Sequence, residues 1–167
     1  MKGILNSFSQ SKNISCFLLS LCFLLCIGCS EDEGEFDFPL EGSNLSMADI
    51  AGSWTAIFAE FQLLSDPNNN VEIVSQGGSM TLNIQNNGRF TSTINVPGGS
   101  SEQFSGQLGF SGSQLVLLDD VDEPGDEAFL TIDLTSNDVL ELGGILAFDF
   151  DDNGTFEETA ISLQMVR

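Results

Sequence analysis

Oxygen-bearing side chains recur at every second position at the start of the segment 149–157, DFDDNGTFE. With Gly154 as the sixth residue, this spacing matches the beginning of a calcium-binding loop, because hard oxygen ligands suit Ca²⁺. The twelfth position is Ala160, where such a loop carries a bidentate glutamate. The same residues also suit a tight turn between two strands, so the segment predicts either a calcium site or a turn. The candidate ligands are Asp149, Asp151, Asn153 and Glu157.

Other catalytic chemistry is largely excluded by composition. After residue 29 the chain contains no histidine, lysine, tyrosine or further cysteine. This removes Ser-His and Cys-His nucleophile pairs, Schiff bases, a P-loop lysine and zinc held by His or Cys. A carboxylate pair of the glycosidase type is the remaining enzymatic chemistry. Because 25 acids place two carboxylates within reach by chance, we expect the protein not to be an enzyme.

The N-terminal segment combines positive charge with a short apolar run. Lys2 and Lys12 are its only charged residues, and the apolar stretch 14–27 follows them. About fourteen residues is short of the ~20 that a membrane-spanning helix needs. A basic region followed by a short apolar region is typical of a secretory signal that is removed from the mature protein.

The end of that run, Leu25-Cys26-Ile27-Gly28-Cys29, resembles the bacterial lipobox, with Cys26 where leucine is usual. The resemblance implies that 1–28 is a lipoprotein signal peptide and that Cys29 is diacylated, which anchors the protein stably in a membrane. An ordinary signal peptide containing cysteines is the alternative. The other three cysteines lie in the removed segment, so the mature chain has no disulfide.

Residues 29–46 predict an acylated cysteine and a flexible acidic tether, because they contain acids, Gly and Pro without a sustained period. Ser30-Glu31-Asp32-Glu33 resembles the surface-export signal of Bacteroidota lipoproteins. We therefore expect an outer-membrane location facing the exterior, with the periplasmic face as the alternative. Only Arg89 and Arg167 oppose all 25 acids after residue 29, a net charge of −23. Such a surface repels nucleic acid.

From 47 to 167 apolar and polar residues alternate, and Gly, Asn and Asp turns interrupt the alternation, as in Asn86-Asn87-Gly88. The pattern predicts about eight strands, introduced by a short helical turn within 44–50. Longer connections follow the first, third, fifth and seventh strands, which places them at one end. We predict an all-β, eight-stranded antiparallel up-and-down barrel, because closure removes exposed edges. A β-sandwich is the alternative.

Gly52-Ser53-Trp54 at the start of the first strand resembles the G-x-W motif of lipocalin-like (calycin) barrels. The resemblance covers most of 47–167 and implies that Trp54 plugs the closed end. Closure also pairs the first strand with the last, so Trp54 should meet Arg167, as an arginine packs across the tryptophan in calycins. The chain lacks tyrosine, and with it the second lipocalin motif.

A barrel of this size is either filled by side chains or holds one small ligand. The leading hypothesis is a binding protein whose barrel takes a small apolar molecule. The alternative is a structural or protein-interaction lipoprotein with a filled barrel. The residues expected to face a ligand are Phe58, Phe90, Phe104, Phe110, Leu130 and Phe148.

Overall fold

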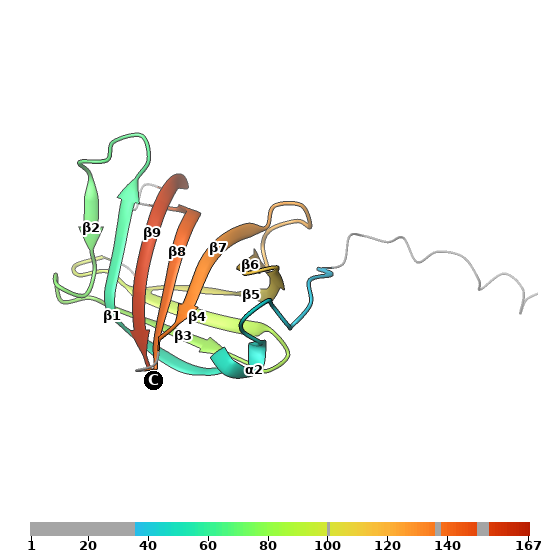
Figure 1. Cartoon of the computed structure of the whole chain (residues 1–167). Helices are drawn as coiled ribbons and strands as arrows, with labels where there is room; N and C mark the ends of the chain where they lie inside the picture. Colours follow the sequence, from blue (N-terminus) through green and yellow to red (C-terminus); the bar gives the residue numbers. More distant parts are fainter. Residues whose placement is uncertain (1–35, 100, 136–137, 150–153) are drawn as a thin grey trace, which may run out of the picture. The chain divides into compact units, whose positions relative to one another are not determined.

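The alternating segments form a nearly all-β domain (Figure 1). The computed structural model describes residues 36–99, 101–135, 138–149 and 154–167. Its elements are α2 (Met47–Ile50), β1 (Gly52–Leu63), β2 (Asn70–Glu72), β3 (Ser79–Ile84), β4 (Arg89–Asn95), β5 (Ser101–Ser111), β6 (Gln114–Asp119), β7 (Ala128–Leu134), β8 (Val139–Phe148) and β9 (Glu157–Val166).

Eight of these strands close into a barrel. The order β1-β3-β4-β5-β6-β7-β8-β9 is antiparallel throughout, and β1 pairs in turn with β9. The predicted up-and-down barrel is therefore confirmed, and the β-sandwich is excluded. The additional strand β2 lies in a segment predicted as a loop. It pairs with residues 60–62 of β1. On the same edge of β1, β3 pairs only with residues 52–55, so β2 covers a part of β1 that β3 does not reach.

The two ends of the barrel differ. Short connections join β3–β4, β5–β6 and β7–β8 at one end, where α2 also lies, and this is the closed end. The longer connections after β1, β4, β6 and β8 lie at the other, open end. The predicted alternation of loops and the predicted helical turn are both confirmed.

Two glycines allow large side chains to cross the barrel interior. A Cβ atom on Gly106 would lie 2.8 Å from Cε1 of Phe90 and 2.1 Å from a backbone oxygen. A Cβ atom on Gly144 would lie 2.5 Å from Cδ2 of Leu130. Because these contacts are shorter than a carbon atom tolerates, the interior packs around both glycines.

Residues 36–46 pack against the barrel. Phe110 donates its backbone N–H to the Pro39 carbonyl, and Ser43 donates its own to the Gly112 carbonyl, each at 2.8 Å. The segment covers the last residues of β5, which extend beyond the paired part of β4 and would otherwise present an open edge. The predicted tether therefore differs from the structure in this part, and the folded domain begins before residue 47. Residues 29–35 lie outside the described residues.

Candidate functional site

The closed end is built around Trp54, which is 1% exposed. Its indole Nε1 donates a hydrogen bond of 2.8 Å to the Ile50 carbonyl at the end of α2. The Arg167 guanidinium stacks over the ring, with Cζ 4.5 Å from the ring centroid. Arg167 also donates a hydrogen bond to the Asp49 carbonyl. The predicted meeting of Trp54 and Arg167 is confirmed.

The short helix α2 is held by its own capping contacts. The Asp49 carboxylate accepts hydrogen bonds from the Ser46 hydroxyl at 2.7 Å and the Ser46 backbone N–H at 2.8 Å. These two bonds, the hydroxyl first, lower the pKa of Asp49. The cap fixes the two carbonyl groups, of Asp49 and Ile50, that the Arg167 and Trp54 side chains bind.

The barrel interior is predominantly apolar, and five of the six residues expected to face a ligand contribute to it. Phe90, Phe110 and Leu130 are at most 3% exposed, and Phe148 is 5% exposed. The fifth residue, Phe104, is partly buried against the same core.

Phe58 is the exception, and its predicted interior position is wrong. A β-bulge between Ala56 and Phe58 shifts the alternation of β1 by one residue. After the bulge, Ala59 opposes the buried Leu163, whereas Phe58 opposes the exposed Gln164. Directly opposed residues of an antiparallel pair point to the same face, so Phe58 lies on the outside of the barrel.

Phe61 takes the interior place that the simple alternation gives to Phe58. Its ring packs against Phe148 with centroids 4.7 Å apart, and Phe61 is 3% exposed. The sequence carries no clear signal for the bulge, so Phe61 was not among the predicted interior residues. This aromatic pair fills the β1–β8–β9 side of the open half.

Other inward-facing side chains of the open half keep part of their apolar surface exposed. Four apolar residues on the neighbouring strands β5 to β8 occupy inward positions but remain partly exposed. Leu117 opposes Leu108 of β5, whose side chain is buried in the interior, so Leu117 also faces inward. On its other side Leu117 opposes Ala128 of β7, which therefore faces inward too. Leu146 opposes the buried Thr159. We call this set the mouth cup: Phe104, Leu117, Ala128 and Leu146.

Exposed apolar side chains also stand on the loops around the open end. Val121 in the β6–β7 connection is 87% exposed, and Phe156 before β9 is 63% exposed. Leu64, at the end of β1, is 38% exposed. The Leu64 backbone N–H donates to the Glu158 carbonyl at 3.1 Å, which brings the β1 and β9 sides of the rim together. The entrance to the mouth cup is therefore partly apolar despite the acidic surface.

A hollow of about 230 Å³ lies beside the closed end. Residues 42–45, the β5–β6 turn and the last residues of β7 enclose it. Phe110, Ile132 and Leu134 form its apolar wall, and Asp133 adds a carboxylate. It is a smaller and more polar space than a pocket for a drug-sized apolar molecule.

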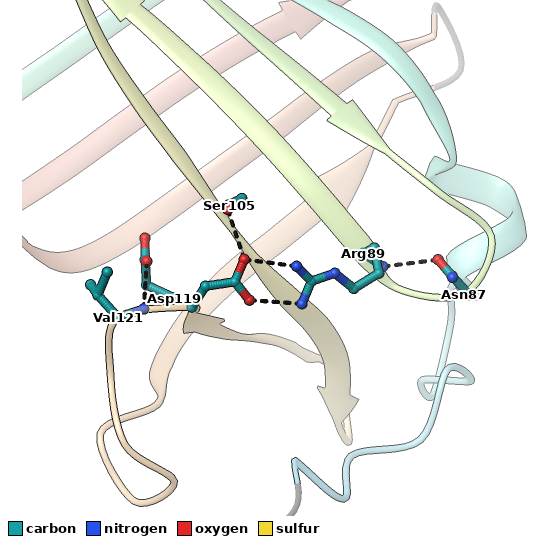
Figure 2. A network of polar contacts seen from close by, with 6 residues as sticks. Asn87, Arg89, Ser105, Asp119 and Val121 are labelled. Carbon is teal, nitrogen blue, oxygen red and sulfur yellow. Dashed lines mark hydrogen bonds and ion pairs between the residues drawn. The ribbon is translucent and has the colours of Figure 1, made fainter.

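An ion pair fixes the start of the β6–β7 loop at the open end (Figure 2). The Arg89 guanidinium contacts both carboxylate oxygens of Asp120, at 2.7 and 2.8 Å, and Ser105 donates its hydroxyl to the same group at 2.7 Å. The Arg89 contact is the main reason that the pKa of Asp120 is lowered, and the pKa of Arg89 is raised in return. Because both side chains are 39% exposed, the pair positions the loop more than it stabilises the fold.

The remainder of that loop brings several carboxylates close together. Partial burial and then the negative charges of Asp119 and Asp126 raise the pKa of Asp122. Backbone hydrogen bonds from Asp122 to Asp119 and from Asp126 to Glu123 fold the loop on itself. These acids therefore repel one another in the ionised state.

The candidate calcium ligands are only partly described. Asp149 and Glu157 stand at the facing ends of β8 and β9, where Glu157 opposes Phe148. The Asp149 carboxylate accepts a hydrogen bond of 2.7 Å from the Gly154 backbone N–H. Asp151 and Asn153 lie outside the described residues. Within the described part of the chain, no cluster of three or more acidic, Cys or His residues is arranged to hold a metal ion.

The calcium hypothesis stays a prediction with a direct test. If the loop binds Ca²⁺, millimolar Ca²⁺ at fixed ionic strength should raise the melting temperature, because the ion binds the folded state preferentially. Asp151→Asn should reduce that shift, since it removes one charged ligand. The measurement is thermal melting of both proteins with and without Ca²⁺. No shift in the wild type, or an equal shift in both proteins, would leave only the turn.

No protein-family profile matches this chain, and no curated protein matches it. Among the described residues, no helix has both the length and the apolar character needed to cross a membrane. Cys29 precedes the described part of the chain, so the structure does not test its predicted role.

Proposed function

We propose that the protein is a lipid-anchored, lipocalin-like protein of the outer membrane, facing the cell exterior, that binds a small apolar molecule in its mouth cup. The proposed anchor rests on the cysteine-containing motif Leu25–Cys29 and on the acidic residues that follow it. Ligand binding rests on a separate feature, the open half of the barrel.

The observation that carries the binding proposal is the partial exposure of inward-facing apolar residues. At the closed end, Trp54, Leu140 and Met165 are at most 1% exposed, as expected of a filled core. At the open end, Phe104, Leu117 and Leu146 occupy inward positions yet stay partly exposed. Covering this apolar surface would remove it from water, which is favourable by roughly 25 cal/mol per Å².

Side chains that already occupy the barrel interior limit the space for a ligand. Phe61 and Phe148 fill the other side of the open half, and the Phe90 ring passes over Gly106 below the cup. We therefore expect a small apolar molecule rather than a long acyl chain. A strongly anionic ligand is disfavoured, because the chain after residue 29 carries a net charge of −23.

The rival function is a structural or protein-interaction lipoprotein with a filled barrel. The Phe61–Phe148 pair favours it, because side chains already occupy much of the interior. The two functions differ in whether apolar molecules bind at the open end.

Binding can be tested with the neutral fluorophore N-phenyl-1-naphthylamine, whose emission rises in an apolar site. The wild type should enhance its emission, and Phe104→Glu should weaken binding about tenfold or more, because the ligand would bury a carboxylate. Phe129→Glu is the matched control, since Phe129 is 45% exposed on the outer face. No enhancement by the wild type would favour the filled barrel. Equal binding by the two variants would place the site outside the mouth cup.

A further inference from the structure

An aromatic cluster lies on the outer face of β5–β7, where the described chain begins. The rings of Phe36 and Phe38 are 5.1 Å apart, and Phe38 meets Phe129 of β7 edge-on at 6.1 Å. We call Phe36, Phe38 and Phe129 the aromatic patch. Next to it, Ile145 on β8 is 52% exposed.

The patch is built into the fold. A Cβ atom on Gly109 would lie 2.5 Å from Cβ of Phe38, so glycine at this position allows the segment to lie flat on β5. Val116, which opposes Phe129 on the outer face, is 0% exposed. The segment is held further along by the hydrogen bond from Phe110 to Pro39. Three rings are thus held together on an outer face, and their free sides remain in water.

Phe129 is 45% exposed, and Phe36 and Phe38 are partly buried beside it. Apolar side chains that gather at the surface mark an interaction surface. Phe129 and the neighbouring Ile145 are among the exposed large apolar side chains of the described residues, on a chain that carries 25 acids. A partner that covers this cluster would remove its apolar surface from water. The position of the patch along the chain indicates what the partner is. Cys29 lies seven residues before Phe36, and seven residues reach at most about 25 Å.

We propose that the aromatic patch rests on the surface of the membrane that holds the Cys29 lipid. This inference depends on the lipid anchor of the proposed function. The short segment between Cys29 and Phe36 would keep the patch near the lipid headgroups. Aromatic rings insert favourably there, at the boundary between the headgroups and the acyl chains. The acidic domain would be repelled by anionic lipids, so the matching surface is zwitterionic.

Docking through the patch sets the orientation of the barrel. Strands β5 to β7 then face the bilayer, and β1 and β3 face away, because they lie across the closed barrel from β6 and β7. The mouth cup opens along the membrane surface, where apolar molecules that partition into the bilayer are concentrated.

Quenching by brominated lipids tests the orientation on the full-length protein. The protein is purified from expressing cells, checked for acyl chains by mass spectrometry, and reconstituted into nanodiscs of brominated phosphatidylcholine. Phe129→Trp places a tryptophan in the patch, and the matched control Thr81→Trp places one at an exposed position on β3. Trp54 is buried inside the barrel and gives the same background in both.

The tryptophan at position 129 should be quenched about twofold or more above that at position 81, because only the former meets acyl chains. Equal quenching in acylated protein would overturn the docking proposal and leave the anchor intact. A mass without acyl chains would overturn the anchor and the docking together.

Discussion

Replacing Cys29 with alanine should abolish incorporation of an azide-labelled fatty acid and leave unprocessed precursor in the cell. The thioether forms on the cysteine sulfur, and no later residue of the chain is a cysteine that can take its place. We therefore expect complete loss of labelling rather than a reduction. The measurement is in-gel detection of the fatty-acid label together with the apparent mass of the protein.

The matched control is Cys22→Ala, which removes a cysteine from the predicted signal peptide outside the lipobox-like motif. This variant should be labelled like the wild type. Labelling of Cys29→Ala at the wild-type level would show that the acyl chains are attached elsewhere, and would remove the proposed anchor. Surface exposure is a separate question, which protease treatment of intact cells answers.

Trp54→Ala should destabilise the domain by about 3–5 kcal/mol, the cost typical of truncating a fully buried large side chain. Trp54 is 1% exposed, and its loss also leaves the Ile50 carbonyl without its indole partner and Arg167 without a ring to stack on. The free energy of unfolding should be measured by urea titration followed by circular dichroism, because the substitution removes the only tryptophan fluorescence.

Arg167→Ala is the companion variant. It removes the stacking partner and the hydrogen bond to the Asp49 carbonyl while leaving the indole in place, so we expect a smaller loss of about 0.5–2 kcal/mol. The loss of unfolding free energy in the double variant should not exceed the sum of the two single losses, because both substitutions remove the same stacking contact. A loss below about 1 kcal/mol for Trp54→Ala would show that Trp54 does not organise the closed end.

Several features of the fold could be predicted because they depend on local patterns. Alternation identifies strands, since successive side chains point to opposite faces of a sheet. Turn sequences such as Asn86–Gly88 mark the hairpins, and Gly88 indeed has a positive φ of 84°. The contact between Trp54 and Arg167 also follows from the sequence once closure is assumed, because closure brings the start of the first strand beside the end of the last.

The candidate site was predicted less completely. Its interior residues on β4 to β8 follow from unbroken alternation, so Phe90, Phe104 and Phe148 were placed correctly. On β1 the bulge places Phe58 on the outside of the barrel and Phe61 in the interior, contrary to the simple alternation. A bulge adds one unpaired residue and bends the strand locally. It is defined by the pairing of β1 with β9, so the residues of β1 read alone do not reveal it.

The sequence by itself determined that this chain forms an antiparallel barrel with long loops at one end. It also limited the chemistry, because no His, Lys or Tyr occurs after residue 29. Only the tertiary structure decided that Phe61 and Phe148 pack together in the open half, since they lie on strands far apart in the chain. It also decided that residues 36–46 belong to the domain. Their acids, Gly and Pro predict a tether, yet Phe38 packs over Gly109 because β5 extends past its neighbour and leaves an edge to cover.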